Sequence, residues 1–142
     1  MISKMPINDD LIRKRISEIR EGVALLRRYL EKEFRELDIS ETLSIRYLII
    51  QLVEAASSIC MHILSSMYQE YPEGYPACFL TMAKKGLIPR DLGERLARAA
   101  RLRNLLVHGY WEIDDRKVYE AVRRGFKDFI EFVKIIERLI MK

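Results

Sequence analysis

LSIRYLIIQLVEAASSICMHILSSM, residues 43–67, is the most informative stretch of this 142-residue chain for its fold. Apolar residues occupy nearly every face of a helix here, and no strand-like alternation interrupts them. A helix that is apolar all round is buried on more than one side. We therefore predict a long helix, capped by Ser40 and ending near Tyr68, within an all-α fold. In a chain of this size, part of the helix is also expected to pack against a second subunit.

Apolar residues at alternating steps of three and four predict further helices on both sides of this stretch. Caps, glycines and prolines divide them into four, at residues 9 to about 37, 77–85, 90–108 and 115 to about 141. The predicted caps are Asn8 for the first helix and Asp114 or Asp115 for the last. The expected architecture is an antiparallel four- or five-helix bundle that forms a single domain over residues 1–142.

Among the polar residues that interrupt the apolar second helix are Glu54, Ser57, Ser58 and His62. We expect the two serines to make local hydrogen bonds to the backbone, and His62 to be an interior histidine whose ring is hydrogen-bonded. A buried carboxylate needs a partner. Glu54 is therefore predicted to pair with Arg103 or with another arginine of the fourth helix.

Cys60 and Cys78 lack the spacing of a metal or redox motif, and we interpret them as reduced, buried thiols. Reduced thiols are typical of a cytosolic protein. The N-terminus has no apolar signal core, and no uncharged run reaches the length of a membrane span. We therefore expect a soluble, cytoplasmic protein that does not bind membranes.

The basic residues are concentrated in one segment of the chain. Residues 1–83 contain 10 basic and 12 acidic residues, residues 84–127 contain 12 and 6, and residues 128–142 contain 3 and 3. The net charge of +4 therefore comes from the middle segment. A localised basic field is typical of proteins that bind nucleic-acid backbones, although it also improves solubility. Arg98 and Arg101, in this segment, are candidate RNA-binding residues.

Residues 103–110, Arg-Asn-Leu-Leu-Val-His-Gly-Tyr, lie where the fourth helical pattern stops at Gly109. His108 can exchange a proton near neutral pH, and Arg103 carries a planar cation that matches phosphate oxygens. Together they suit phosphodiester cleavage. A five-residue offset turns the two side chains about 140° apart on an ideal helix. Either the long arginine side chain reaches around to the ligand of the histidine, or a second copy of the helix completes the site. The simpler interpretation of His108 is a cation that favours the helix C-terminus.

Other catalytic classes lack their residues in this sequence. Two histidines and two cysteines at distant positions do not supply a zinc site. The sequence contains no glycine-rich phosphate loop and no nucleophile elbow. We expect neither a metal nor a cofactor. The lack of a metal site fits a metal-independent ribonuclease in which the 2′-hydroxyl of RNA is the nucleophile.

The pattern Arg-x4-His-x-Tyr over residues 103–110, followed by Trp-Glu-Ile-Asp at 111–114, resembles the signature of the HEPN superfamily and of its HepT-like toxin branch. Asn104 matches the polar residue that often follows the motif arginine. Glu-Ala-Ala-Ser at residues 54–57 also looks typical of the family. The similarity extends over most of the chain.

The resemblance implies a homodimeric, metal-independent RNA endonuclease, the toxin of a type VII-like toxin–antitoxin pair. It implies three catalytic residues: His108 as acid or base, Arg103 stabilising the transition state, and Asn104 orienting the phosphate or the catalytic pair. HepT-like toxins are commonly encoded beside an MntA-type nucleotidyltransferase antitoxin. That antitoxin is expected to adenylylate Tyr110 and so to block the RNA groove.

A second hypothesis comes from a different class of function. The chain could be a non-catalytic helical bundle that serves as the binding subunit of a minimal nucleotidyltransferase. The apolar second helix and the low specificity of a lone Arg/His pair favour this alternative. It predicts a stable complex without RNA hydrolysis.

Overall fold

The apolar stretch at residues 43–67 lies within a 30-residue helix in the computed structural model of the chain, which describes residues 7–109 and 112–140. The helices are α1 (Asp9–Leu30), α2 (Ile39–Tyr68), α3 (Tyr75–Lys84), α4 (Arg90–His108), α5 (Asp115–Gly125) and α6 (Lys127–Ile140), with a 3₁₀ turn, η1 (Phe34–Glu36). None of the described residues forms a strand, so the predicted all-α bundle is confirmed.

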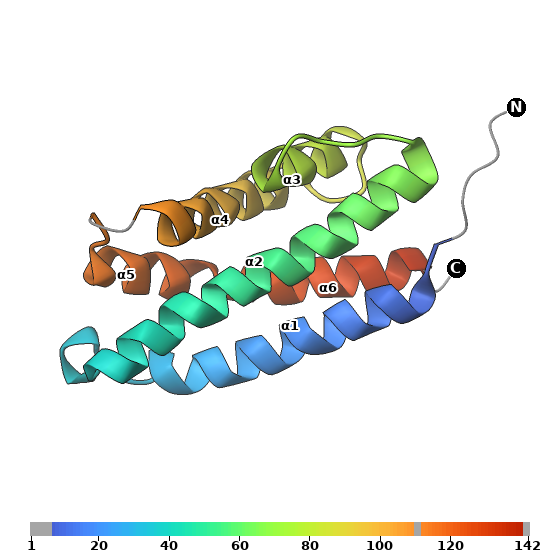
Figure 1. Cartoon of the computed structure of the whole chain (residues 1–142). Coiled ribbons are helices and arrows are strands. Elements are labelled where there is room, and N and C mark those ends of the chain that lie inside the picture. Colours follow the sequence, from blue (N-terminus) through green and yellow to red (C-terminus); the bar gives the residue numbers. More distant parts are fainter. Residues whose placement is uncertain (1–6, 110–111, 141–142) are drawn as a thin grey trace, which may run out of the picture.

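α2 is the central element of the bundle. It contacts each of the other five α-helices, and Figure 1 shows it crossing in front of α6 and beside α1. Leu52, Ile59 and Ile63 of α2 are at most 1% exposed. Burial of an aliphatic side chain of this size contributes roughly 1.5–3 kcal/mol. The predicted burial of α2 on several sides is therefore confirmed within a single chain.

α1 begins where the sequence predicted but ends earlier. The Asn8 side chain accepts a backbone N–H of the first turn at 3.1 Å, which confirms it as the cap. The helix stops at Leu30 and not near Leu37, so the predicted length is wrong. Glu33 and Glu36 form a reciprocal capping box that begins η1. The apolar spacing continues past Leu30, but these local hydrogen bonds satisfy the backbone in a different conformation.

The cap of α2 is Asp38, so the prediction of Ser40 is wrong. The Asp38 carboxylate accepts the Glu41 N–H at 2.8 Å, and the Glu41 carboxylate accepts the Asp38 N–H at 3.1 Å. The Ser40 hydroxyl instead donates to Asp38. Hydrogen bonds from the Glu41 backbone and the Ser40 side chain lower the pKa of Asp38. A carboxylate is the stronger cap here because its charge also favours the helix N-terminus.

The last predicted helix is divided in two. Asp114 caps α5 by accepting two backbone N–H groups, as predicted. The helical ladder is interrupted at Phe126, directly after Gly125, and α6 then continues to Ile140. A glycine weakens a helix and favours a bend at this point. The apolar repeat runs through the bend without a change in spacing, which is why the sequence predicted one helix.

α3 and α4 pack at very close range. A β-carbon added to Gly93 of α4 would lie 2.6 Å from the Ala83 Cβ and 3.1 Å from the Phe79 carbonyl oxygen of α3. α3 begins at Tyr75, two residues before the predicted start, and it is followed by Gly86 with φ +76°, as expected for a closing glycine. The bounds of α4 agree with the prediction.

Cys60 and Cys78 are fully buried, as predicted, but they form a disulfide between α2 and α3. The prediction of reduced thiols is therefore wrong. Their Cα atoms lie 6.2 Å apart, within the usual range for a bridge. Neither residue spacing nor burial distinguishes two reduced thiols from two that meet across a helix pair. The expected cytoplasmic location loses the support of the thiols and stays a prediction.

The polar residues of α2 differ in part from expectation. The His62 ring accepts the Asn8 N–H at 2.8 Å, so it is hydrogen-bonded as predicted, but it is only half-buried. The Ser58 hydroxyl accepts a hydrogen bond from the Arg15 Nε–H at 3.1 Å, and it does not bond to the local backbone. The buried Ser57 hydroxyl has no hydrogen-bond partner among the described residues. The prediction of local backbone bonds is therefore wrong for both serines.

By length and composition, one helix within residues 7–109 and 112–140 could cross a membrane, namely α2. In the bundle, 61% of its apolar window is buried by the chain itself. A core helix of a globular protein has the same composition. The expected absence of a membrane partner stays a prediction.

Candidate active site

Arg103 lies on the inner face of α4. It shares that face with Leu96 and Ala100, because residues seven and three positions apart lie above one another on a helix. Both neighbours are at most 1% exposed. The guanidinium of Arg103 is therefore directed toward the rest of the bundle, and its side chain is only 18% exposed.

Three side chains hold this guanidinium. Its Nη2 donates to Glu54 Oε2 of α2 at 2.9 Å, and its Nη1 donates to Asn104 Oδ1 at 3.1 Å. The ring of Tyr75, the first residue of α3, lies 4.9 Å from the Arg103 Cζ in a cation–π contact. We call Arg103, Glu54, Asn104 and Tyr75 the Arg103 clamp. The predicted pairing of Glu54 with Arg103 is confirmed, although the Glu54 side chain is 45% exposed and not buried.

The clamp fixes the arginine but does not use all of its donors. Each terminal nitrogen of a guanidinium carries two hydrogens. Within the described residues, Nη1 and Nη2 of Arg103 each make one hydrogen bond, and the buried Nε makes none. Donors thus remain for an anion. An arginine held in place loses less side-chain entropy when it binds phosphate than a mobile one does.

His108 occupies the last turn of α4, as the sequence predicted, and its side chain is exposed. The helix ends directly after it, where the Gly109 N–H donates to the Leu105 carbonyl at 2.6 Å. A cationic imidazole at this end is favoured by the helix dipole. Within the described residues, no hydrogen bond fixes the ring, so its orientation is open to a ligand.

Arg103 and His108 face different directions in the single chain. A five-residue offset turns side chains about 140° on an ideal helix, and the fold keeps that divergence: Arg103 faces α2 and α3, whereas His108 faces solvent. One chain therefore holds both groups at one end of α4 without directing them into a common pocket.

Four exposed residues follow the outer face of the C-terminal half of α4: Arg98, Arg101, Leu105 and His108. They fall within about 80° of one another around an ideal helix. We call this row the α4 stripe. It joins the two predicted RNA-binding arginines to the predicted catalytic histidine, and it lies on the side of α4 opposite Arg103.

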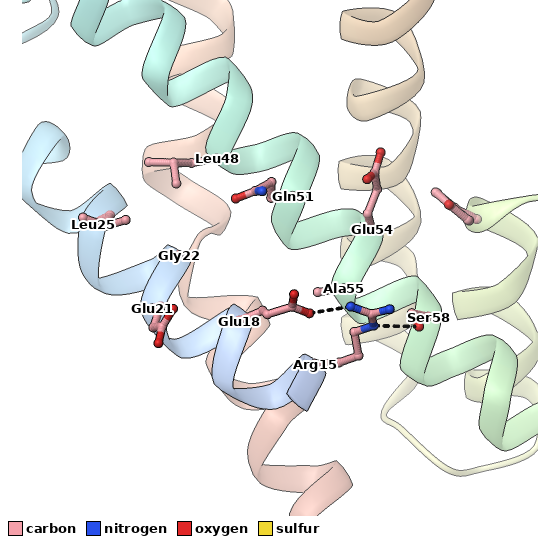
Figure 2. Close-up of a pocket in the computed structure, with 11 residues that line it drawn as sticks. Arg15, Glu18, Glu21, Gly22, Leu25, Leu48, Gln51, Glu54, Ala55 and Ser58 are labelled. Atoms are coloured by element: carbon pink, nitrogen blue, oxygen red, sulfur yellow. Dashed lines mark hydrogen bonds and ion pairs between the residues drawn. The ribbon is translucent and has the colours of Figure 1, made fainter. Parts of the chain in front are cut away.

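A groove of about 490 Å³ separates α1 from α2 next to the clamp. Figure 2 shows its lining, with Glu54 directed away from α1. Glu18, Glu21 and Glu54 contribute three carboxylates, against one cation, Arg15. Arg15 already donates to Glu18 at 2.8 Å and to Ser58. The groove is therefore acidic and disfavours a phosphate backbone, whereas the α4 stripe is cationic.

Two features of the site could not be recognised in the sequence. Tyr75 lies in a segment predicted as a loop, and only tertiary packing brings it to Arg103. Arg46 of α2 donates to both carboxylate oxygens of Asp115 at 2.6 and 2.7 Å. The hydrogen bond to Asp115 raises the pKa of Arg46. This pair holds the start of α5 against α2.

Tyr110, the predicted adenylylation site, lies outside the described residues.

The described residues suit an anionic ligand better than a metal ion. No three His, Cys, Asp or Glu side chains of residues 7–109 and 112–140 gather as a metal would require. The C-terminal half of α4 carries the arginines at 98, 101 and 103 and the imidazole of His108. These are donors for phosphate oxygens.

The antiparallel bundle and the Arg-x4-His pattern at the end of α4 define a helical domain of the HEPN class. A model of the family described as Ribonuclease HepT-like matches residues 14–136. The chain belongs to this family of HepT-like ribonucleases.

Individual relatives agree with this assignment. The chain is 27% identical over 132 residues to a tRNA nuclease HepT of Aphanizomenon flos-aquae, covering 87% of this chain and 90% of that protein. It is 30% identical over 84 residues to an mRNA nuclease HepT of Shewanella oneidensis, a match that spans 59% of this chain and 63% of the relative. A solved structure of a tri-AMPylated HEPN toxin of Shewanella oneidensis with its MNT antitoxin has a TM-score of 0.83 at 24% identity, over 91% of this chain and 98% of that one. At that identity the likeness concerns the fold.

Proposed function

We propose that this protein is a metal-independent endoribonuclease, the toxin of a type VII-like toxin–antitoxin pair in the cytoplasm. The observation that carries the proposal is the Arg103 clamp, which fixes a guanidinium with remaining donors near the helix end that presents His108. Membership of a ribonuclease family gives the substrate class. The two related proteins are named as nucleases of mRNA and tRNA, which agrees with an RNA substrate.

In the proposed reaction, the 2′-oxygen of RNA attacks the adjacent phosphorus and the P–O5′ bond breaks. His108 takes the 2′-hydroxyl proton or protonates the leaving 5′-oxygen. Arg103 stabilises the negative charge that develops on the non-bridging oxygens. Asn104 accepts a hydrogen bond from Arg103 and so orients it. Arg98 and Arg101 bind the flanking phosphates along the α4 stripe.

The opposed directions of Arg103 and His108 support a site completed by a second copy of the chain. Glu54 pairs with Arg103 of α4 and Arg46 with Asp115 of α5, so this part of α2 lies beside the end of α4 and the start of α5. Large apolar side chains remain exposed on two of these helices: Leu43 at 49% and Tyr47 at 59% on α2, and Leu105 at 45% on α4. A homodimer would cover them and bring two motif-bearing helix ends together.

We also propose that a MntA-like nucleotidyltransferase antitoxin inhibits the protein by adenylylating Tyr110. The solved complex of a tri-AMPylated HEPN toxin with an MNT antitoxin supports this proposal by analogy. An AMP group two residues from His108 would add bulk and negative charge where RNA phosphate binds.

The alternative function is a non-catalytic binding subunit of a nucleotidyltransferase. The Arg103 clamp supports this alternative in one respect, because Glu54 already neutralises the charge of Arg103 in the absence of RNA. The two functions differ in growth on expression. An active nuclease arrests growth and its His108→Ala variant does not, whereas a scaffold leaves growth unchanged in both cases.

The test is RNA cleavage in EDTA by protein freed of AMP. We expect His108→Ala and Arg103→Ala each to reduce the rate at least about 100-fold. Arg28→Ala, a change at an exposed position of α1, is the matched control and should leave it unchanged. Cleavage that persists in both active-site variants, or no cleavage by the wild type, would contradict the proposal.

Mixing the two inactive variants tests the composite site. If each site takes Arg103 from one copy and His108 from the other, half of the dimers in a mixture contain one intact site, and about a quarter of wild-type activity returns. If both groups act within one chain, mixing restores nothing. Light scattering of the purified protein gives its oligomeric state independently.

A further inference from the structure

A second groove, of about 410 Å³, lies between α4 and the α5–α6 pair and includes no residue of the Arg103 clamp. Figure 1 shows α4 running above α5 and α6. The floor is apolar and comes from four helices, with Ile49, Leu96, Val122 and Phe129 all buried. Small residues, Ala99 and Ala121, leave the space open. Its size falls within the range of roughly 300–1,000 Å³ typical of small-molecule sites.

Three arginines line this groove, but only two remain available to a ligand. Arg95 interacts with the carboxylates of Asp91 at 3.0 Å, Asp128 at 3.1 Å and Glu131 at 3.6 Å. Its pKa is raised by the hydrogen bond to Asp91 first and by that to Asp128 next. Arg98 and Arg124 are exposed, and neither has an ion-pair partner among the described residues. The groove is therefore apolar inside and cationic at its rim.

This combination fits a nucleobase joined to its phosphates. A base presents flat apolar faces, which pack against aliphatic side chains and against the planes of arginine guanidinium groups. Phe129 is only 1% exposed, so the base would contact Ala99 and Ala121 and lie beneath an arginine. The phosphates on either side of the base would meet Arg98 and Arg124.

The groove is continuous with the α4 stripe, because Arg98 belongs to both. Arg98 and His108 are ten residues apart, which is about 15 Å along a helix. A single RNA strand on this face could therefore place one base in the groove while a phosphate a few nucleotides away lies at His108.

We propose that the groove between α4 and α5–α6 binds one unstacked base of the RNA, so that the preferred substrate is single-stranded on one side of the cleaved bond. This proposal rests on the ribonuclease function proposed above. A base-paired strand cannot release a base into the groove without losing its pairing and stacking, so duplex RNA should be a poor substrate.

The test measures binding without cleavage. Single-stranded DNA lacks the 2′-hydroxyl and is not cut by the proposed reaction, so its dissociation constant can be measured on the wild type. The probes are an oligodeoxyadenylate and an abasic strand of the same length and charge. We expect the wild type to bind the strand with bases about tenfold more tightly. Ala121→Trp fills the groove and should bind the two strands equally.

The rim arginines are tested separately, because a tryptophan at position 121 could disturb folding. Arg98→Gln and Arg124→Gln lie at exposed positions, and each should lower the slope of log affinity against log salt by about one. Arg28→Gln on α1 is the control of equal charge and should change the slope less. Circular dichroism and urea unfolding establish that each variant is folded.

The proposal is overturned if Ala121→Trp, folded as the wild type, keeps the preference for bases, or if both rim variants behave as Arg28→Gln does. A groove variant with unchanged DNA binding but a changed oligomeric mass would assign the groove to a protein contact and equally overturn it. The cleavage assay is independent of these readings. If the wild type prefers the strand with bases but cuts no RNA, the base-binding groove stands and the nuclease function is contradicted. If the wild type cuts RNA but binds both strands alike, the nuclease function stands and the base-binding groove is contradicted.

Discussion

Replacing Gly93 by alanine should separate the two effects of a β-carbon in a helix. Alanine raises helix propensity by about 1 kcal/mol over glycine. At Gly93, however, the new carbon would lie 2.6 Å from the Ala83 Cβ, where two such carbons normally stay about 3.5–4.0 Å apart. α3 would have to move away by roughly 1 Å. The Phe79 carbonyl oxygen, 3.1 Å from the added carbon, restricts the directions in which the two helices can shift.

α3 resists this movement. It is attached to α2 by the Cys60–Cys78 disulfide, and its Phe79 and Met82 side chains are fully buried. Overpacking of a core costs about 1–3 kcal/mol, and contact with rigid atoms places this case in the upper half of that range. After the gain in propensity, we expect Gly93→Ala to lower the free energy of unfolding by about 1–2 kcal/mol.

Gly22→Ala is the matched control. Its β-carbon would meet only the end of the Leu52 side chain, at 2.9 Å, and that end can rotate. This variant should be neutral or more stable by up to about 1 kcal/mol. Urea unfolding followed by circular dichroism gives both values, provided that it is repeated at two protein concentrations to detect coupling to oligomerisation.

Ala83→Gly tests the cause directly. In the Gly93→Ala background it removes the clashing carbon, so it should restore stability there although it is destabilising alone. The reasoning is refuted if Gly93→Ala is as stable as Gly22→Ala, or if Ala83→Gly costs the same in both backgrounds.

Four further predictions concern the remaining polar groups. Ser57→Ala should raise the free energy of unfolding by about 1 kcal/mol in urea melts, because it removes a buried hydroxyl without a partner. Cys60→Ser with Cys78→Ser should lower it by about 3 kcal/mol, the value for a loop of this length, and thiol titration of the denatured wild type should find no reaction at these two residues. The melting temperature should fall as the pH drops below about 4.5, because four carboxylates have a lower pKa in the folded than in the unfolded chain: Asp38, Glu41, Asp91 and Glu137. Such a group contributes its full stabilisation above its unfolded pKa, which is 3.8–4.5 here, and loses it as the carboxylate protonates at lower pH. Glu54→Gln keeps an acceptor for Arg103 and removes a charge, so RNA affinity should rise several-fold with little change in kcat, whereas Glu54→Ala should lower kcat about tenfold; equal kinetics for the two would contradict the orienting role of Glu54.

The helices that the sequence predicted best are those whose ends are marked by backbone chemistry. α4 has a proline before it and a glycine after it, and both of its bounds agree. The end of α1 could not be predicted, because the apolar spacing continues while Glu33 and Glu36 satisfy the backbone in another way. Asp38 and Ser40 are both good caps two residues apart, and the charge of Asp38 together with its reciprocal bonds with Glu41 selects the former.

In the candidate site, too, some contacts could be predicted from the sequence and others could not. The pairing of Glu54 with Arg103 was predicted from the need of a buried carboxylate for a partner. The partner is correct, although the Glu54 side chain is 45% exposed and the premise of burial is wrong. The Tyr75 contact and the Cys60–Cys78 bridge depend on how α3 returns against α2 and α4. No periodicity within either partner contains that information, because it arises from packing between elements far apart in the chain.

The opposed faces of α4 explain why the two motif residues have such different surroundings. A residue on the inner face, such as Arg103, is positioned by α2 and α3, so its geometry is as stable as the bundle. A residue in the last turn on the outer face, such as His108, is positioned only by the helix end and by whatever binds there. A fixed cation and an adjustable proton carrier are compatible with one reaction, because charge stabilisation requires preorganisation whereas proton transfer requires the imidazole to approach the 2′-hydroxyl or the leaving 5′-oxygen of a bound strand. The five-residue spacing therefore assigns each group to the environment that its proposed chemistry needs, and a second helix end is required only to bring the two environments to the same phosphate.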